Sequence, residues 1–154
     1  MNRKRLYIGY GSNLDMEQMA FRCPGARLLA KSWLHDYRLV FQGQPYNAHA
    51  NVIPEEGHDV PVAIWEITAQ DEARLDIYEG VRGGYYTKEY MQVEVDGKMR
   101  EGLIYIMTPH DFGIPSDGYL DTIARGYEDF NFDIRILNRA VLHAYAHRKL
   151  RKAQ

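Results

Sequence analysis

Short apolar runs rich in β-branched and aromatic residues recur through the first half of the chain and predict strands. Residues 5–10 (RLYIGY) predict a first, buried strand. Residues 26–42 (ARLLAKSWLHDYRLVFQ) predict one long strand or two short ones, and residues 60–67 (VPVAIWEI) predict another. The intervening residues 43–59 are rich in turn-forming residues, so we expect turns there rather than a strand.

Residues 68–80 (TAQDEARLDIYEG) carry the clearest helical pattern. Thr68 suits the N-cap, Asp71 and Glu72 suit the first turn, and Gly80 suits the C′ position. Three further segments predict helices: residues 14–23, 115–130 and 133–153. We expect Ser12 or Asn13 to cap the first of these and Ser116 to cap the second. The last is amphipathic and ends in basic residues, which suits a helix C-terminus.

A hairpin is predicted over residues 85–107, because two β-rich runs flank Asp96 and Gly97 and this dipeptide is a strong hairpin signal. Strands therefore precede and follow a central helix, without the regular alternation of a βαβ array. The pattern predicts an α+β (mixed α/β) fold, with a small, partly closed β-sheet or barrel surrounded by helices.

Length and composition bound the protein class. A chain of 154 residues fits one domain, residues 1–154. The net charge of −2 gives no case for nucleic acid or an anionic membrane as partner. We expect no signal peptide and no membrane span, since no apolar run approaches the roughly 18 residues that a span needs. The single cysteine, Cys23, excludes an intrachain disulfide and favours a reducing compartment such as the cytoplasm.

The stretch YIGYGSNLDMEQM, residues 7–19, joins a predicted strand to a helix through a glycine turn. Gly9 and Gly11 fit the first two positions of a G-x-G-x-x-G fingerprint, but Leu14 occupies the third, so a dinucleotide-binding oxidoreductase is disfavoured. Glycines and a helix start can hold a small anion such as a carboxylate. A turn whose N–H groups are satisfied internally is the other interpretation, and the turn alone does not separate the two.

The stretch DIYEGVRGGYY, residues 76–86, places Glu79 at the end of the clearest helix. A carboxylate is unfavourable there and would ordinarily lie in solvent. If Glu79 instead points into a tyrosine-lined cleft, its pKa rises and it can act as a general acid and base near neutral pH. On these residues alone, the solvated glutamate is the favoured interpretation.

Taken together, YGSNL and EGVRGGYY resemble the γ-glutamylcyclotransferase-like superfamily, in which a strand leads into a Y-G-S-N turn and a later E-G-V segment carries the essential glutamate. Further segments are similar to other parts of the family pattern, and the resemblance covers most of residues 5–145. These segments are AHANVIP (48–54), VAIWEI (62–67), GLIYIMT (102–108) and IPSDGYLDTIARGYEDFNF (114–132). Two positions depart from the pattern: Ala63 replaces a common glycine, and His49 precedes Ala50.

The resemblance implies intramolecular aminolysis. The α-amine of a γ-glutamyl group attacks its own γ-carbonyl and releases 5-oxoproline and a free amine, with Glu79 as the acid and base and with no cofactor or metal. Transferase or lyase chemistry and a role in glutathione metabolism are implied. The resemblance also implies that N–H groups at residues 9–13 hold the substrate carboxylate or the oxyanion, and that Tyr86, Tyr105 and Tyr119 donate hydrogen bonds. The implied substrate-binding residues are Tyr7, Gly9, Tyr10, Gly11, Ser12, Asn13, Leu14, Tyr86, Tyr105 and Tyr119.

Three alternatives remain open. The substrate is a γ-glutamyl amino acid, a γ-glutamylamine, or a γ-glutamyl-protected intermediate of a biosynthetic pathway. A non-catalytic ligand-binding module of the same fold is the rival from another class. In every case the expected partner is a small γ-glutamyl molecule, with no nucleic acid and no membrane, and a homodimer is left open. His143 and His147 have a zinc-compatible i, i+4 spacing, but no third ligand is evident, so we predict no metal.

Overall fold

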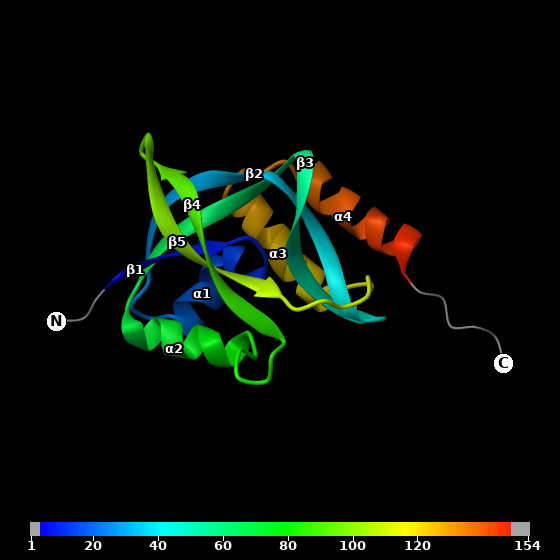
Figure 1. Cartoon of the computed structure of the whole chain (residues 1–154), viewed down its shortest axis with the longest axis horizontal. Helices are drawn as coiled ribbons and strands as arrows, with labels where there is room; N and C mark the ends of the chain where they lie inside the picture. The colour runs from blue at the N-terminus through cyan, green and yellow to red at the C-terminus, as the bar shows by residue number, and fades with distance from the viewer. Residues whose placement is uncertain (1–3, 149–154) are drawn as a thin grey trace.

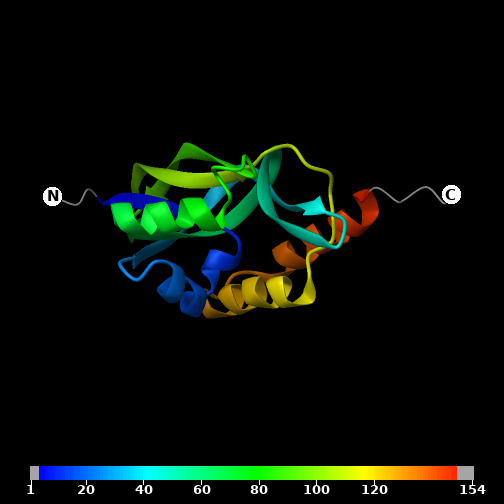
Figure 2. The ribbon, with the colours of Figure 1, turned by 90° about the horizontal axis from the view of Figure 1, so that it is seen from below.

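The computed structural model describes residues 4–148 and confirms the α+β class. Within these residues a sheet of five strands has the order β2-β3-β1-β5-β4. The strands are β1 (Arg5–Gly9), β2 (Arg27–Gln44), β3 (Asn47–Ile67), β4 (Tyr86–Val95) and β5 (Lys98–Met107). The helices are α1 (Met16–Arg22), α2 (Ala69–Tyr78), α3 (Asp117–Asp129) and α4 (Ile134–His147). Figure 1 shows these elements along the chain, and Figure 2 shows α1, α3 and α4 on one side of the sheet.

Strand β1 lies in the middle of the sheet, which matches its short, fully apolar centre. It pairs antiparallel with β3, from Arg5 opposite Ile67 to Gly9 opposite Ala63. On its other side it pairs parallel with β5, where Tyr7 lies opposite Leu103. The turn that follows β1 is therefore anchored to a strand held on both sides.

The sheet is not closed into a barrel. Strands β2 and β4 are its two edges, and they approach each other where the Ser32 hydroxyl donates a hydrogen bond of 2.8 Å to the carbonyl of Glu94. This side-chain contact bridges the edges without a backbone ladder, so the structure is a strongly curved open sheet.

The turns expected over residues 43–59 are mostly strand. Strand β3 spans all of residues 47–67 and pairs with β2 along nearly its whole length. Pro45 and Tyr46 do form a turn, which joins β2 to β3. The turn-forming residues near Gly57 are instead absorbed in a bulge, where Asp36 and Gly57 both have positive φ and the Gly57 N–H donates to the Asp36 carboxylate over 3.0 Å. A bulge lets a paired strand accommodate such residues, so local composition misidentified this segment.

Helix α2 follows the prediction closely. Thr68 and Asp71 form a capping box, in which the Asp71 N–H donates to the Thr68 hydroxyl and the Thr68 N–H donates to the Asp71 carboxylate. Gly80 has a φ of 62°, as a C′ glycine should. The buried Asp71 carboxylate also accepts from the N–H of Gly25, which ties the start of α2 to the loop that follows α1.

Helix α1 begins later than predicted. Ser12–Leu14 form a separate 3-10 turn, and Asp15 stands at the N-cap position of α1, so neither Ser12 nor Asn13 caps it. Ser116 caps α3 as predicted, by accepting from the N–H of Tyr119. The basic end expected for the last helix extends to residue 153, and its residues 149–153 lie outside the described residues.

The predicted hairpin forms between β4 and β5 with Asp96 and Gly97 at its turn, both at positive φ. Cys23 is buried, and its burial raises the pKa of the thiol to about 12, which fits a structural residue rather than a nucleophile. None of the helices within residues 4–148 has the length and apolar character needed to cross a membrane.

Candidate active site

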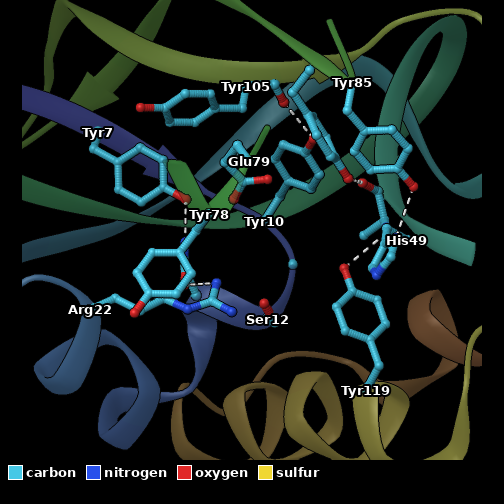
Figure 3. Close-up of a pocket in the computed structure, with 14 residues that line it drawn as sticks. Tyr7, Tyr10, Ser12, Arg22, His49, Tyr78, Glu79, Tyr85, Tyr105 and Tyr119 are labelled. Carbon is cyan, nitrogen blue, oxygen red and sulfur yellow. Dashed lines mark hydrogen bonds between the residues drawn. The ribbon is translucent and has the colours of Figure 1, made fainter. Parts of the chain in front are cut away.

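A cavity of about 160 Å³ opens where the turn after β1, the end of α2 and the start of β4 meet. Figure 3 shows the side chains that surround it. Two stretches of it come from the glycine-containing segments singled out in the sequence, and the remainder comes from β3, β5, α1 and α3. The lining residues are Tyr7, Tyr10, Gly11, Ser12, Asn13, Arg22, His49, Ala50, Tyr78, Glu79, Tyr85, Tyr86, Tyr105 and Tyr119.

Glu79 lies at the C-cap of α2, where its N–H donates to the carbonyl of Leu75 over 2.8 Å. Gly80 then turns the chain away, so the side chain of Glu79 projects into the cavity between the phenols (Figure 3). Within residues 4–148 its carboxyl has no hydrogen-bond or ion-pair partner within the protein. Burial raises the pKa of Glu79 to about 7, while the charge of Arg22 acts in the opposite direction. A carboxyl group with this pKa can both take and give a proton near neutral pH.

The turn after β1 faces Glu79 across the cavity. The N–H groups of Leu14 and Asp15 donate to the carbonyls of Gly11 and Ser12, each over 3.0 Å. Within the described residues, the N–H groups of Ser12 and Asn13 have no such acceptor. A Cβ on Gly11 would lie 3.2 Å from the Cβ of Ala50, so glycine lets the backbone approach this wall closely.

Side chains of the turn are held by hydrogen bonds. The amide of Asn13 donates to the Tyr7 hydroxyl over 2.9 Å. The side-chain amide of Gln18 in α1 donates to the Ser12 hydroxyl over 2.8 Å and to the side-chain oxygen of Asn13 over 3.1 Å. These bonds give the turn one arrangement before any ligand arrives, so it is pre-organised.

Five of the seven phenols that line the cavity fall into two groups. Those of Tyr10, Tyr86 and Tyr105 donate to protein acceptors, namely the carbonyls of Tyr105 and Ala50 and the carboxylate of Asp76. Tyr86 and Tyr105 line the cavity as predicted, and here both donate their protons to groups of the protein.

In the second group the hydroxyl oxygen accepts a hydrogen bond, which leaves its own proton available. Tyr7 accepts from Asn13, and Tyr119 accepts from the N–H of Ala50 over 3.0 Å. Burial raises the pKa of both hydroxyls, so they remain protonated donors at neutral pH. The sequence reveals none of this division, because it depends on which backbone groups each phenol meets.

Two predicted residues lie off the cavity. Gly9 is the last residue of β1 and does not line the cavity. Leu14 is fully buried and packs against α3, where a Cβ on Gly126 would lie only 2.4 Å from the Leu14 Cβ. Leu14 therefore anchors the turn to the core instead of contacting a ligand.

Five lining residues were not predicted as part of the site: Arg22, His49, Ala50, Tyr78 and Tyr85. His49 accepts or donates a hydrogen bond of 2.8 Å with the Tyr85 hydroxyl, depending on its tautomer. Burial and the charge of Arg22 lower the pKa of His49, so it is neutral at pH 7. Tyr85 could have been predicted as a site residue because it adjoins Tyr86 in the sequence. Arg22 could not, because an arginine at the end of a helix is common on protein surfaces.

Residues 4–148 contain no group of three histidine, cysteine, aspartate or glutamate side chains arranged to hold a metal ion. His143 and His147 stack on each other with ring centroids 4.1 Å apart, and Phe112 packs against the ring of His143. This pair therefore packs as an aromatic cluster on α4, away from the cavity.

Comparisons with known proteins agree on one family. Residues 7–126 match the model of a family described as gamma-glutamyl cyclotransferase, AIG2-like. The gamma-glutamylcyclotransferases of Homo sapiens and Mus musculus are each 30% identical to this chain over 132 residues, which cover 80% of this chain and 70% of theirs. A solved structure described as a gamma-glutamyl cyclotransferase superposes with a TM-score of 0.80 at 24% identity, covering 99% of this chain and 92% of its own.

Proposed function

The chain belongs to the gamma-glutamyl cyclotransferase, AIG2-like family, and on this premise we propose that it converts a γ-glutamyl amino acid or γ-glutamylamine to 5-oxoproline and the free amine. The observation that carries the proposal is the carboxyl of Glu79. Burial raises the pKa of this carboxyl to about 7, and it faces the tyrosine-lined cavity without a hydrogen-bond or ion-pair partner among the described residues.

The proposed reaction rearranges bonds within one substrate. The α-amine nitrogen forms a bond to the γ-carbonyl carbon, and the bond from that carbon to the departing nitrogen breaks. Glu79 takes a proton from the attacking nitrogen and returns it to the departing nitrogen, so one carboxyl serves both steps. No water is consumed, because the substrate supplies its own nucleophile.

The turn after β1 supports the electrostatic side of the proposal. The free N–H groups of Ser12 and Asn13 point to a binding site for the α-carboxylate of the γ-glutamyl unit. The protons of Tyr7 and Tyr119 are the available donors for the oxygen that becomes negative during attack. Donors held by protein contacts before binding need little reorganisation, which is what oxyanion stabilisation requires.

Holding the substrate in a folded shape is the other task. The attacking amine and the carbonyl belong to one flexible molecule, so catalysis gains from confining it in a near-attack geometry. A cavity of about 160 Å³ with Glu79 and the turn on facing walls suits a compact, curled γ-glutamyl unit.

The test is a substrate screen with mass detection of 5-oxoproline. The purified chain is incubated with γ-glutamyl-alanine, ε-(γ-glutamyl)-lysine and a panel of other γ-glutamyl compounds. Release of 5-oxoproline from at least one of them supports the proposal. A thermal shift with these compounds in the absence of any cyclised product would favour the non-catalytic binding module and overturn the proposal.

A further inference from the structure

Arg22, the last residue of α1, is the one guanidinium among the described residues that line the cavity. It donates a hydrogen bond of 3.2 Å to the side-chain oxygen of Asn13, and its guanidinium lies 4.4 Å from the centre of the Tyr78 ring. Figure 3 shows it on the lower wall, beside Tyr78 and below Glu79.

Unlike several other arginines of the chain, Arg22 has no carboxylate partner within residues 4–148. Arg27, Arg38 and Arg135 each form an ion pair with a carboxylate. A half-buried guanidinium carries five N–H donors in a planar fork and is costly to leave without a counter-ion. The donors that Asn13 does not use match the geometry of a carboxylate, which a guanidinium binds with two parallel hydrogen bonds.

The position of Arg22 in the cavity indicates which carboxylate of the substrate it binds. Tyr78, whose ring lies under the Arg22 guanidinium, is 48% exposed, whereas Tyr7 and Tyr10 of the same cavity are buried. The Arg22–Tyr78 pair therefore marks the solvent side of the cavity. Because Tyr7 and Tyr10 close the buried end, the solvent side is where the departing group of a γ-glutamyl unit has room.

We propose that Arg22 is a specificity-determining residue that binds the carboxylate of the departing amino acid, so that γ-glutamyl amino acids are used in preference to γ-glutamylamines. The inference rests on the proposed function and deepens it, because it selects between substrate classes that the proposed chemistry leaves open. The Tyr78 ring, whose centre lies 4.4 Å from the guanidinium, attracts it by a cation–π interaction and limits its motion, which lowers the entropy lost when a carboxylate docks.

A matched pair of substrates tests the proposal. γ-Glutamyl-alanine and γ-glutamyl-ethylamide share the glutamyl unit and the amide bond, and the second differs from the first only in lacking the departing carboxylate. The wild-type chain should have the higher kcat/KM for γ-glutamyl-alanine. In Arg22→Gln the ratio of the two kcat/KM values should fall by roughly 10- to 100-fold, the usual weight of hydrogen bonds to a charged group.

Further variants separate recognition from folding. Arg22→Lys keeps the charge but loses the planar fork, so its substrate ratio should lie between those of the wild type and Arg22→Gln. Arg27→Gln removes an exposed arginine of β2 and serves as the matched control. Its ratio should equal that of the wild type. Ratios are compared across the whole pH profile, because the loss of Arg22 also removes a charge that lowers the pKa of Glu79.

The outcomes distinguish failure of the inference from failure of the function. An unchanged ratio in Arg22→Gln, whether both activities are retained or both fall together, would overturn the role of Arg22 and leave the cyclotransferase proposal standing. Weaker product inhibition by 5-oxoproline in Arg22→Gln would also overturn it, since 5-oxoproline carries only the glutamyl carboxylate. If the wild type forms no 5-oxoproline from any γ-glutamyl compound, the proposed function fails and this inference fails with it.

Discussion

Two glycine-containing turns form facing walls of the same cavity, and they are built on opposite principles. In the turn after β1, the side chains of Ser12 and Asn13 are tied by hydrogen bonds to Gln18 and Tyr7. In the turn after α2, the carboxyl of Glu79 has no partner within residues 4–148, and burial raises its pKa to about 7. One turn is a rigid set of donors, and the other presents a single reactive group whose chemistry comes from its surroundings.

This difference shows how a small site can divide recognition from proton transfer. Donors work best when the protein holds them still before the substrate binds. A general acid and base must instead change its protonation state during each turnover, which a strong partner for one state would oppose. The substitutions below change one side of this comparison at a time.

Glu79→Gln should have the largest effect. It preserves shape and removes the proton exchange, so turnover should fall by about 10²- to 10⁴-fold. The measurement is the rate of 5-oxoproline release, with the melting temperature as a check on folding. Glu128→Gln on the exposed face of α3 is the matched control and should keep full turnover. Near-normal turnover in Glu79→Gln would remove Glu79 from the proposed role.

Gly11→Ala tests the rigid turn. The added Cβ would lie 3.2 Å from the Cβ of Ala50 and 3.5 Å from the Tyr119 hydroxyl, so the turn or its neighbours must shift by a few tenths of an ångström. Small misplacements of a binding element are costly in catalysis, and we expect kcat/KM to fall by about tenfold. Gly118→Ala, which meets no atom within 4 Å, is the control and should leave kcat/KM unchanged. Equal behaviour of the two variants would contradict a requirement for close approach at Gly11.

Tyr119→Phe and Tyr86→Phe test the division of the phenols. Each removes a hydroxyl bonded to the backbone of Ala50, so each should lower the melting temperature. The Tyr119 hydroxyl also has a free proton for the oxygen that becomes negative, so Tyr119→Phe should lower kcat/KM by about tenfold, the lower limit for a hydrogen bond to a charged group, because Tyr7 shares that oxygen. A larger kinetic loss in Tyr86→Phe than in Tyr119→Phe would show that the division is wrong.

The smallest effect concerns stability against pH. Because the pKa of Glu79 rises from 4.5 to about 7 on folding, the folded state holds a proton that the unfolded state has released between these values. Glu79 therefore favours folding below about pH 4.5, and this contribution is lost as the pH rises through 7. As the pH rises from 4.5 to 7, the melting temperature of Glu79→Gln should therefore increase relative to that of the wild type. If the melting temperatures of the two proteins change in parallel with pH, the raised pKa of Glu79 is contradicted.

Much of the fold follows from local patterns, as Thr68, Gly80 and the Asp96–Gly97 turn show, because caps and tight turns depend on residues near in sequence. Most of residues 43–59 were wrongly predicted as turns, because pairing with β2 holds residues 47–59 in a strand despite their turn-forming composition. Tertiary pairing of this kind leaves no signal in a short window.

The candidate site divides in the same way. The two motif turns were predicted from the residues that carry them, and Glu79 and the Ser12–Asn13 turn do meet at one cavity. Arg22 and Tyr78 were missed because a cation on a helix end and a tyrosine before a C-cap are common surface residues. Leu14 was assigned to the ligand because it adjoins the motif, although its neighbour in space is Gly126.

The central position of β1 has a consequence for how local stability varies around the cavity. Its amides are shielded by β3 on one side and by β5 on the other, so we expect them to be among the slowest to undergo hydrogen exchange. The turn after β1 thus follows a strand whose backbone hydrogen bonds should open only rarely. The segment after α2 is less tightly packed, because a Cβ on Gly84 would meet no atom within 4 Å, so we expect its amides to exchange faster than those of β1.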